Sequence, residues 1–255
     1  MSDSYRALTE YYLPPSETMP RARAAAEKAL QLDESLADAH ASLGVVKLIY
    51  DWDWAAAEKE FRRAIELNPN LPTGYRRLAG LLTVLGQPDQ ASVESRRAQE
   101  LDPLSLLVVQ NQGFNLFMSR RFDSAIEQCR KALEMEPNYW PVRVPLGLSM
   151  AQKGSFSVAV AELEKAWQAS NSPLVLAMLG STYARAGRRP GAEKALAQLR
   201  AISKRRYTCP YETGIVHLEL GRKDEFIALA AKRIRTAVDL HGVHEYGPPS
   251  ECPAL

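Results

Sequence analysis

Histidine and cysteine are the residue types in this chain best suited to metal binding or nucleophilic catalysis, and the sequence holds four and three of them. His241, His244 and Cys252 lie within twelve residues of one another near the C-terminus. A tetrahedral zinc site needs a fourth ligand and a defined turn. Glu245 or Cys209 could supply that ligand, but the segment has no amphipathic helix to fix it. We therefore predict an irregular tail there and no metal site.

The remaining candidates lack the partners that catalysis requires. Neither His40 nor His217 has a serine or cysteine partner in a recognisable motif. The chain contains no glycine-rich phosphate-binding motif, no HExxH zinc motif and no GxSxG nucleophile motif. We interpret His40 as a structural residue on the packed side of a helix pair, and Cys129 as a small buried hydrophobe. We therefore expect no enzyme activity, no cofactor and no small-molecule substrate.

The composition is that of an ordinary globular protein. Of 255 residues, 46% are hydrophobic and 24% are charged, and the formal net charge is +2. These values exclude an intrinsically disordered chain, and three cysteines in this length exclude a disulfide-stapled mini-protein. A net charge this small does not predict an overall electrostatic preference for nucleic acid.

The N-terminal segment also bears on location. The first ten residues, MSDSYRALTE, include acidic residues and no apolar core, so they do not resemble a secretory signal. No apolar run approaches the roughly 18–20 residues that cross a bilayer. We therefore expect a cytoplasmic protein with reduced cysteines and no membrane insertion.

The elements that would position any functional side chain follow from an internal repeat. Three segments are nearly identical, AIELNP at 64–69, AQELDP at 98–103 and ALEMEP at 132–137, and their prolines are 34 residues apart. Within each repeat, apolar residues follow helical spacing with charged residues opposite, as in EKEFRRAIEL at 58–67. The proline at the end of each repeat stops the second of its helices. Each repeat therefore predicts two amphipathic helices.

Small residues recur at matching positions and predict where the two helices of a repeat touch. Facing small side chains let two helix axes approach to the short end of the usual range. The pairs expected to face each other are Gly44 with Ala57, Gly147 with Ala159, and Gly180 with Ala192.

A 34-residue period with this pattern resembles the tetratricopeptide repeat (TPR). The resemblance implies an all-α fold: a right-handed superhelical solenoid of antiparallel helix pairs, with about seven units and degenerate terminal ones. We expect one repeat domain at 1–240 and an irregular tail at 241–255. The expected units are 3–36, 37–71, 72–105, 106–139, 140–172, 173–206 and 207–240.

Two segments, YDWDW at 50–54 and SKRRY at 203–207, resemble the TPR segments of bacterial multidomain regulators. In those regulators the repeats follow a DNA-binding or protein-kinase domain, and no sequence of that kind occurs in these 255 residues. The resemblance therefore implies a bacterial source but no regulatory output. Within the first segment, Asp53 is expected to cap the following helix.

The resemblance also implies that positions two, five, nine and twelve of each unit line a concave groove. Around these positions the chain is unusually apolar, most of all in VVQNQGFNLFM at 108–118. A helix that is apolar on every side is either buried or binds something, and Phe114, Phe117 and Met118 are not expected to be needed between the helices. We predict a non-catalytic scaffold that binds a peptide segment of a protein partner. The expected groove residues are Val45, Leu48, Arg76, Thr83, Gln110, Phe114, Phe117, Met118, Val144, Leu148 and Ser181.

Two other interpretations of this groove stay open. The same side chains could pack against neighbouring first helices and leave a shallow polar trough. A cryptic active site for small molecules or oligosaccharides would need close acids and bases, of which the groove has few. TPR co-chaperones clamp the terminal carboxylate of heat-shock chaperones with Lys and Asn at positions five and nine. These positions hold only one basic residue, Arg76, and no Asn, so no such clamp is expected.

Between Arg185 and Arg206 there are eight basic residues and one acid. One interpretation is a site for an anionic partner: an acidic protein, a membrane surface or nucleic acid. The other is a solvated helix face whose cations lie near a helix C-terminus. The absence of interleaved aromatic residues argues against binding of single-stranded nucleic acid. The expected patch consists of Arg185, Arg188, Arg189, Arg200, Lys204, Arg205 and Arg206.

Overall fold

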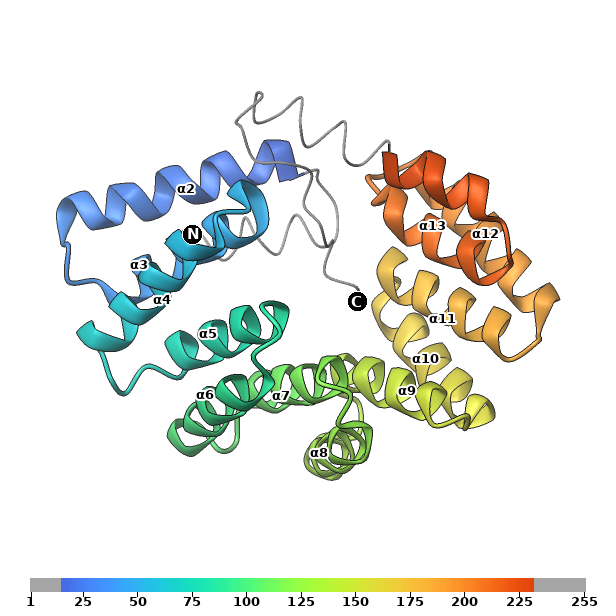
Figure 1. Cartoon of the computed structure of the whole chain (residues 1–255), viewed down its shortest axis with the longest axis horizontal. Coiled ribbons are helices and arrows are strands. Elements are labelled where there is room, and N and C mark those ends of the chain that lie inside the picture. The colour runs from blue at the N-terminus through green and yellow to red at the C-terminus, as the bar shows by residue number, and fades with distance from the viewer. Residues whose placement is uncertain (1–14, 232–255) are drawn as a thin grey trace. The chain divides into compact units, whose positions relative to one another are not determined.

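The computed structural model describes residues 15–231 of the chain, and every regular element in that range is a helix (Figure 1). This confirms the all-α prediction. The chain divides into two compact units, Met1–Pro137 and Asn138–Leu255. The sequence does not predict a boundary at this point, although Pro137 is the last of the three phased prolines.

In the first unit, consecutive helices pack side by side as pairs, α3 with α4, α5 with α6 and α7 with α8, and α2 packs on α3. Each first helix also contacts the first helix of the next pair, so α3, α5 and α7 are neighbours. The elements are α2 (Pro15–Leu32), α3 (Ala37–Val46), the π-helical turn η1 (Lys47–Asp51), α4 (Trp54–Leu67), α5 (Pro72–Val84), α6 (Pro88–Leu101), α7 (Leu106–Met118) and α8 (Phe122–Met135).

The second unit repeats the arrangement. Helix α9 pairs with α10 and α11 with α12, while α13 packs on α11 and α12. Residues 223–231 form a further helical segment. The elements are the 3₁₀ turn η2 (Trp140–Val142), α9 (Arg143–Gln152), α10 (Phe156–Ser170), α11 (Pro173–Arg185), α12 (Arg189–Ser203) and α13 (Pro210–Glu219).

The turn within each pair is formed by a residue in the left-handed backbone region, which ends the first helix. Four of these residues are glycines, which adopt positive φ without steric cost. Trp52 and Arg120, both with φ 58°, occupy the same place in the repeat although their side chains disfavour it. The glycines of the series are Gly86, Gly154, Gly187 and Gly221.

The unit 37–71 has 35 residues, one more than the repeat period, and the turn between α3 and α4 contains the additional residue. The π-helical turn η1 accommodates it, because a π-helical turn holds one residue more than an α-helical turn. Asp53 then begins α4, and its carboxylate accepts a hydrogen bond from the Ala56 N–H at 2.9 Å. This confirms the predicted helix cap.

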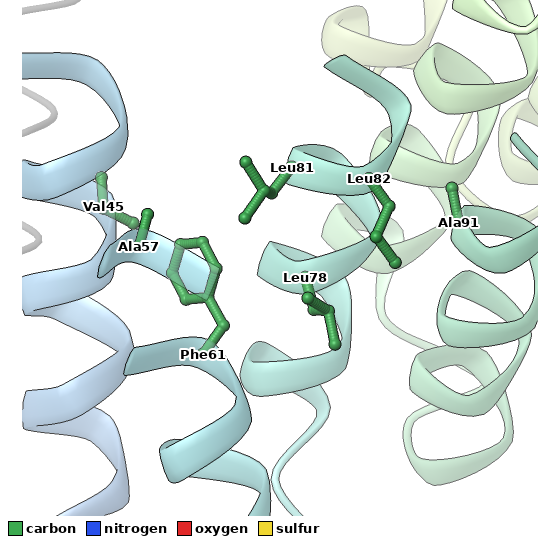
Figure 2. Packing of buried hydrophobic residues seen from close by; sticks show 7 residues of the cluster. All are labelled: Val45, Ala57, Phe61, Leu78, Leu81, Leu82 and Ala91. Atoms are coloured by element: carbon green, nitrogen blue, oxygen red, sulfur yellow. The ribbon is translucent and has the colours of Figure 1, made fainter. Parts of the chain in front are cut away.

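The core of the first unit is built around Phe61 of α4, which is fully buried. Figure 2 shows its ring lying between Val45 and Ala57 on one side and the leucines of α5 on the other. Leu78, Leu81 and Leu82 are likewise buried and belong to the same cluster. One aromatic ring therefore joins two successive helix pairs.

Two glycines of the first helices have nearest neighbours other than those that the sequence predicts. A Cβ added to Gly44 would lie 2.5 Å from Cε1 of Phe61, rather than against Ala57. A Cβ on Gly180 would lie 2.9 Å from the Cβ of Ala195, one turn beyond the expected Ala192. The nearest neighbours of Gly44 and Gly180 are therefore Phe61 and Ala195, rather than the expected Ala57 and Ala192.

In the α9–α10 pair both contacts exist. A Cβ on Gly147 would lie 2.8 Å from Cγ of Leu163 and 3.1 Å from the carbonyl oxygen of the expected partner, Ala159. The larger residue again fills most of the space.

Candidate functional site

The first helices of the first unit carry the residues predicted to bind a peptide. Leu48, Thr83, Gln110, Phe114 and Met118 are all half-buried, so part of each side chain is accessible. They lie on η1, α5 and α7, which follow one another along the array. These residues form the accessible part of the predicted groove in this unit.

Helix α7 presents accessible apolar side chains. Leu107, at position two of its repeat, is 46% exposed, and Phe114 lies two turns further along the same helix. On the preceding first helix, α5, Gly80 occupies the same repeat position as Phe114, and an added Cβ would meet nothing within 4 Å. The open space at Gly80 of α5, together with the partly accessible Phe114 of the neighbouring helix α7, makes this face suitable for an apolar side chain of a partner. We call Leu107, Gln110, Phe114 and Gly80 the α5–α7 face.

Three of the predicted groove residues are buried instead of accessible. Val45 is 5% exposed and belongs to the Phe61 cluster, and Arg76 is 8% exposed. Phe117 is 7% exposed; its ring centroid lies 6.1 Å from that of Phe114 and 6.0 Å from that of Phe122, the first residue of α8. The expectation that Phe117 is not needed between the helices is therefore wrong, because it packs against the second helix of its own pair.

Arg76 contributes to positioning this face. Its guanidinium approaches Oδ1 of Asn111 at 3.5 Å, and Asn111 in turn donates from Nδ2 to the carbonyl oxygen of Leu107 at 2.7 Å. These contacts connect α5 to α7 beneath the α5–α7 face. A buried guanidinium engaged in this way is a positioning group.

In the second unit, the predicted groove residues Val144, Leu148 and Ser181 are half-buried. Val144 and Leu148 pack against the cluster of Val160, Leu163, Met178 and Leu179. Their apolar surface is therefore partly used for packing α9 on α10 and α11.

Half-buried carboxylates at one repeat position link first and second helices. Glu60 of α4 binds Nδ1 of His40 and Nζ of Lys47, each at 2.6 Å. Burial opposes ionisation of Glu60, but the hydrogen bonds from His40 and Lys47 outweigh it and lower the pKa of the carboxyl. Glu162 of α10, 102 residues later, pairs with Arg143 of α9 and with Lys165 of its own helix, and its pKa is also lowered.

The same repeat position holds Glu94 between these two carboxylates. Burial there raises the pKa of Glu94, with only a distant opposing effect of Arg62. Glu60, Glu94 and Glu162 are 34 and 68 residues apart in the sequence, but most of the partners that distinguish them lie on other helices.

The predicted basic patch forms two clusters at the opposite ends of α12. Arg185, Arg188 and Arg189 lie around its first residue, whereas Arg200 and the 204–206 segment lie around its last turn. Helix α12 has 15 residues, which places the clusters about 20 Å apart at roughly 1.5 Å per residue. The basic residues of the expected patch therefore form two groups along α12.

Several of these cations already have partners. Arg185 donates to Oε1 of Gln152 at 3.1 Å and Arg188 to Oγ of Ser157 at 3.4 Å. Arg206 donates to the carbonyl oxygen of Asn171. Arg200, Lys204 and Arg205 are exposed, and no acidic side chain of the described part of the chain lies within ion-pair distance of them.

Of the residues first considered for chemistry, Cys129 and His217 are buried. Burial raises the pKa of the Cys129 thiol to about 12. Burial and the charges of Arg200 and Arg222 lower the pKa of His217. His241, His244, Glu245 and Cys252 lie outside the described residues. Within 15–231 no group of three or more potential ligands could hold a metal ion, and no helix in that range is long and apolar enough to cross a membrane.

Comparison with known proteins gives no matching family model. The small glutamine-rich tetratricopeptide repeat-containing protein 2 of Mycosarcoma maydis is 32% identical over 105 residues, which is 41% of this chain. The Hsp70-Hsp90 organizing protein 2 of Arabidopsis thaliana is 30% identical over 139 residues, which is 52% of this chain. The matches cover 30% and 24% of the lengths of these two relatives.

Solved structures extend the likeness to most of the chain. A chain of the APC/C hetero-tetramer Cut9-Hcn1 superposes with a TM-score of 0.70 at 17% identity, over 93% of this chain and 47% of that one. A thermophilic TPR protein of Thermus thermophilus superposes with a TM-score of 0.60 at 20% identity, over 79% of this chain and 98% of that one. This chain has the fold of the TPR proteins.

The TPR assignment explains the arrangement of the α5–α7 face. In this fold, first helices contact one another across successive repeats, as α5 and α7 do here. The comparisons establish the fold that carries the face. The selection of Leu48, Thr83, Gln110, Phe114, Met118 and the other groove residues as a binding site stays a prediction.

Proposed function

We propose that this protein is a non-catalytic interaction scaffold that binds a peptide segment of a protein partner on the α5–α7 face. The observation that supports this most directly is the accessible apolar surface of α7, with Leu107 46% exposed, beside the open space at Gly80. Burial of such surface is the main favourable contribution to association. The names of the two curated relatives, a TPR-containing protein and a chaperone-organizing protein, support the class of function.

The chemistry of the face indicates the class of peptide. Leu107 and Phe114 favour an apolar anchor residue, and Gln110 between them offers an amide that can pair with the peptide backbone. Removing one such anchor typically costs more than about 1 kcal/mol of binding free energy, which is roughly fivefold or more in affinity. The proposal therefore concerns an extended or helical segment with at least one large apolar side chain.

Selection from a random peptide library on the immobilised chain tests this proposal. Peptides that bind the wild type are measured again on Phe114→Ser and on Val93→Ser. Val93 is 60% exposed on the second helix α6 and is the matched control for removal of an accessible apolar side chain. Binding that weakens about fivefold or more with Phe114→Ser and stays unchanged with Val93→Ser supports the face; the reverse pattern contradicts it.

A cytoplasmic location is part of the same proposal. Cys129 and Cys209 form no disulfide within the described part of the chain, in keeping with a reducing compartment.

A second candidate function rests on the exposed cations at the end of α12. Arg200, Lys204 and Arg205 lack acidic partners among the described residues and could bind an anionic partner. Affinity for a polyanion that falls steeply with salt and is lost with Lys204→Glu and Arg205→Glu would support this function. Absence of binding at low salt would contradict it.

A further inference from the structure

A polar pocket lies between three helices of the first unit and shares no residue with the α5–α7 face. Its volume is about 170 Å³, and its walls come from α6, α7 and α8 and the turn between the last two. This is below the roughly 300–1,000 Å³ typical of drug-sized ligands. The pocket therefore fits a small molecule or ion rather than a peptide.

The lining of this pocket is rich in hydrogen-bond donors. Each polar side chain in it carries at least one N–H or O–H group, two are guanidinium groups, and none is a carboxylate. Positively charged donors without a carboxylate favour an oxyanion. The polar lining residues are Ser92, Ser95, Arg96, Gln112, Asn115, Ser119, Arg121, Ser124 and Gln128.

Existing hydrogen bonds fix part of this wall. Arg121 donates from Nη1 to Oγ of Ser92 at 3.0 Å, and Ser92 donates to the carbonyl oxygen of Pro88 at 2.8 Å. Nη2 of Arg121 binds Oδ1 of Asp89 at 2.5 Å, but the Asp89 side chain is 90% exposed. An ion pair this exposed is weak, so a better-placed anion can replace Asp89 on the guanidinium.

One atom in the pocket wall requires a donor. Oε1 of Gln112 is buried and has no hydrogen-bond partner among the described residues. Buried acceptors in native proteins are paired with protein, water or a ligand. Sulfate carries no donor at neutral pH, whereas hydrogen phosphate and hydroxylated phosphate esters do.

We propose that this pocket binds a small phosphate-bearing compound. Arg96 and Arg121 neutralise the phosphate, and an O–H of the ligand donates to Gln112. The hydroxyls of Ser95, Ser119 and Ser124 donate to the phosphate oxygens, whereas the Ser92 hydroxyl keeps its bond to Pro88. Inorganic phosphate and a phosphate ester share this chemistry. The pocket volume exceeds what phosphate alone requires, so the ester is the expected natural ligand.

Calorimetric titration of the full chain with inorganic phosphate, glycerol 3-phosphate and sulfate at constant ionic strength tests this proposal. The expected order of affinity is glycerol 3-phosphate, then phosphate, then sulfate. Arg121→Gln is expected to weaken phosphate binding about tenfold, as for loss of a charge-assisted hydrogen bond. Asp89→Asn is expected to strengthen it, because the competing carboxylate is removed. Gln112→Leu is expected to abolish the preference for phosphate over sulfate.

Arg97→Gln is the matched control, because Arg97 is adjacent to Arg96 but pairs with Glu100 at 3.2 Å outside the pocket. If Arg121→Gln does not fold, as judged by its circular dichroism, Arg96→Gln takes its place. Absence of phosphate binding, equal losses with Arg97→Gln and the pocket variants, or equal affinity for sulfate and phosphate would each overturn the proposal. Phe114→Ser is expected to leave phosphate binding unchanged, which separates this site from the peptide site.

Discussion

The contact between Gly44 and Phe61 gives the most quantitative prediction. In Gly44→Ala, the new Cβ would lie 2.5 Å and 2.7 Å from two ring carbons of Phe61. Carbon atoms normally approach to about 3.5–4.0 Å, so the ring must move by about 1 Å. Phe61 is fully buried against Leu78, Leu81 and Leu82 and cannot turn outward (Figure 2). Overpacking of this kind costs about 1–3 kcal/mol.

Alanine also gains up to about 1 kcal/mol over glycine in helix propensity, so the expected net loss for Gly44→Ala is about 1–2 kcal/mol. Gly80→Ala is the matched control on α5, because its Cβ would meet nothing within 4 Å. The control should keep the propensity gain and be more stable than wild type by about 0.5–1 kcal/mol.

Thermal unfolding followed by circular dichroism measures both changes. At about 2–4 °C per kcal/mol for a chain of this size, Gly44→Ala should lower the Tm by about 2–8 °C and Gly80→Ala should raise it. Adding Phe61→Leu to Gly44→Ala should restore space, so the double variant should lose less stability than the two single losses combined. A Gly44→Ala variant as stable as Gly80→Ala, or strict additivity with Phe61→Leu, would refute the packing argument.

Further predictions concern thiols, pH and the turns. Because burial raises the pKa of Cys129 to about 12, iodoacetamide at pH 8 should alkylate half-buried Cys209 and spare Cys129 until the chain is unfolded, as peptide mass mapping will show. The pKa of Glu60 is lower in the folded chain than in the unfolded chain, so the ionised carboxylate stabilises the fold at pH values above its unfolded pKa. This stabilisation is lost as the pH falls through the folded pKa, so the Tm advantage of wild type over Glu60→Gln should shrink between about pH 5 and pH 3. The lowered pKa of His217 means that the unfolded chain binds a proton at this residue more readily than the folded chain, so stability should fall as the pH drops below about 6.5. In thermal melts between about pH 7.5 and pH 5, His217→Leu should make the Tm depend less on pH. Arg120→Gly should raise the Tm by relieving the left-handed backbone at φ 58°, and an unchanged or lower Tm would contradict that reasoning.

The helices were predictable because each repeat carries its own start and stop signals. The 34-residue spacing of prolines and the apolar pattern of segments such as 58–67 determine helix type and order locally. The Asp53 cap was predictable for the same reason, since its partner is only three residues away. Local signals of this kind need no knowledge of the neighbouring helices.

Burial on the first helices was less predictable, because it depends on what the neighbouring helices supply. Phe114 and Phe117 are three residues apart on α7, yet only Phe117 meets an aromatic ring of α8 and becomes buried. Arg76 looks like an accessible cation in the sequence but is covered and lies near Asn111 of the next repeat. Such differences come from side chains about one repeat away, which a pattern within one helix does not contain.

The polar pocket and the divided basic patch were missed for related reasons. The pocket draws a few residues from each of three helices, and those on any one helix form no motif by themselves. The basic residues are close in sequence, but α12 separates them along its length. The sequence alone therefore does not reveal that the pocket residues lie close together, nor that α12 separates the basic residues.

The central claim is that a partner peptide lies on the α5–α7 face, and site-specific photo-crosslinking tests it most directly. p-Benzoylphenylalanine is placed in the full chain at Leu107, which is 46% exposed on α7, or at Val93, which is 60% exposed on α6. With a library-selected peptide, irradiation should give a peptide adduct from position 107 and none from position 93. Adducts from position 93 with none from position 107 would contradict the claim.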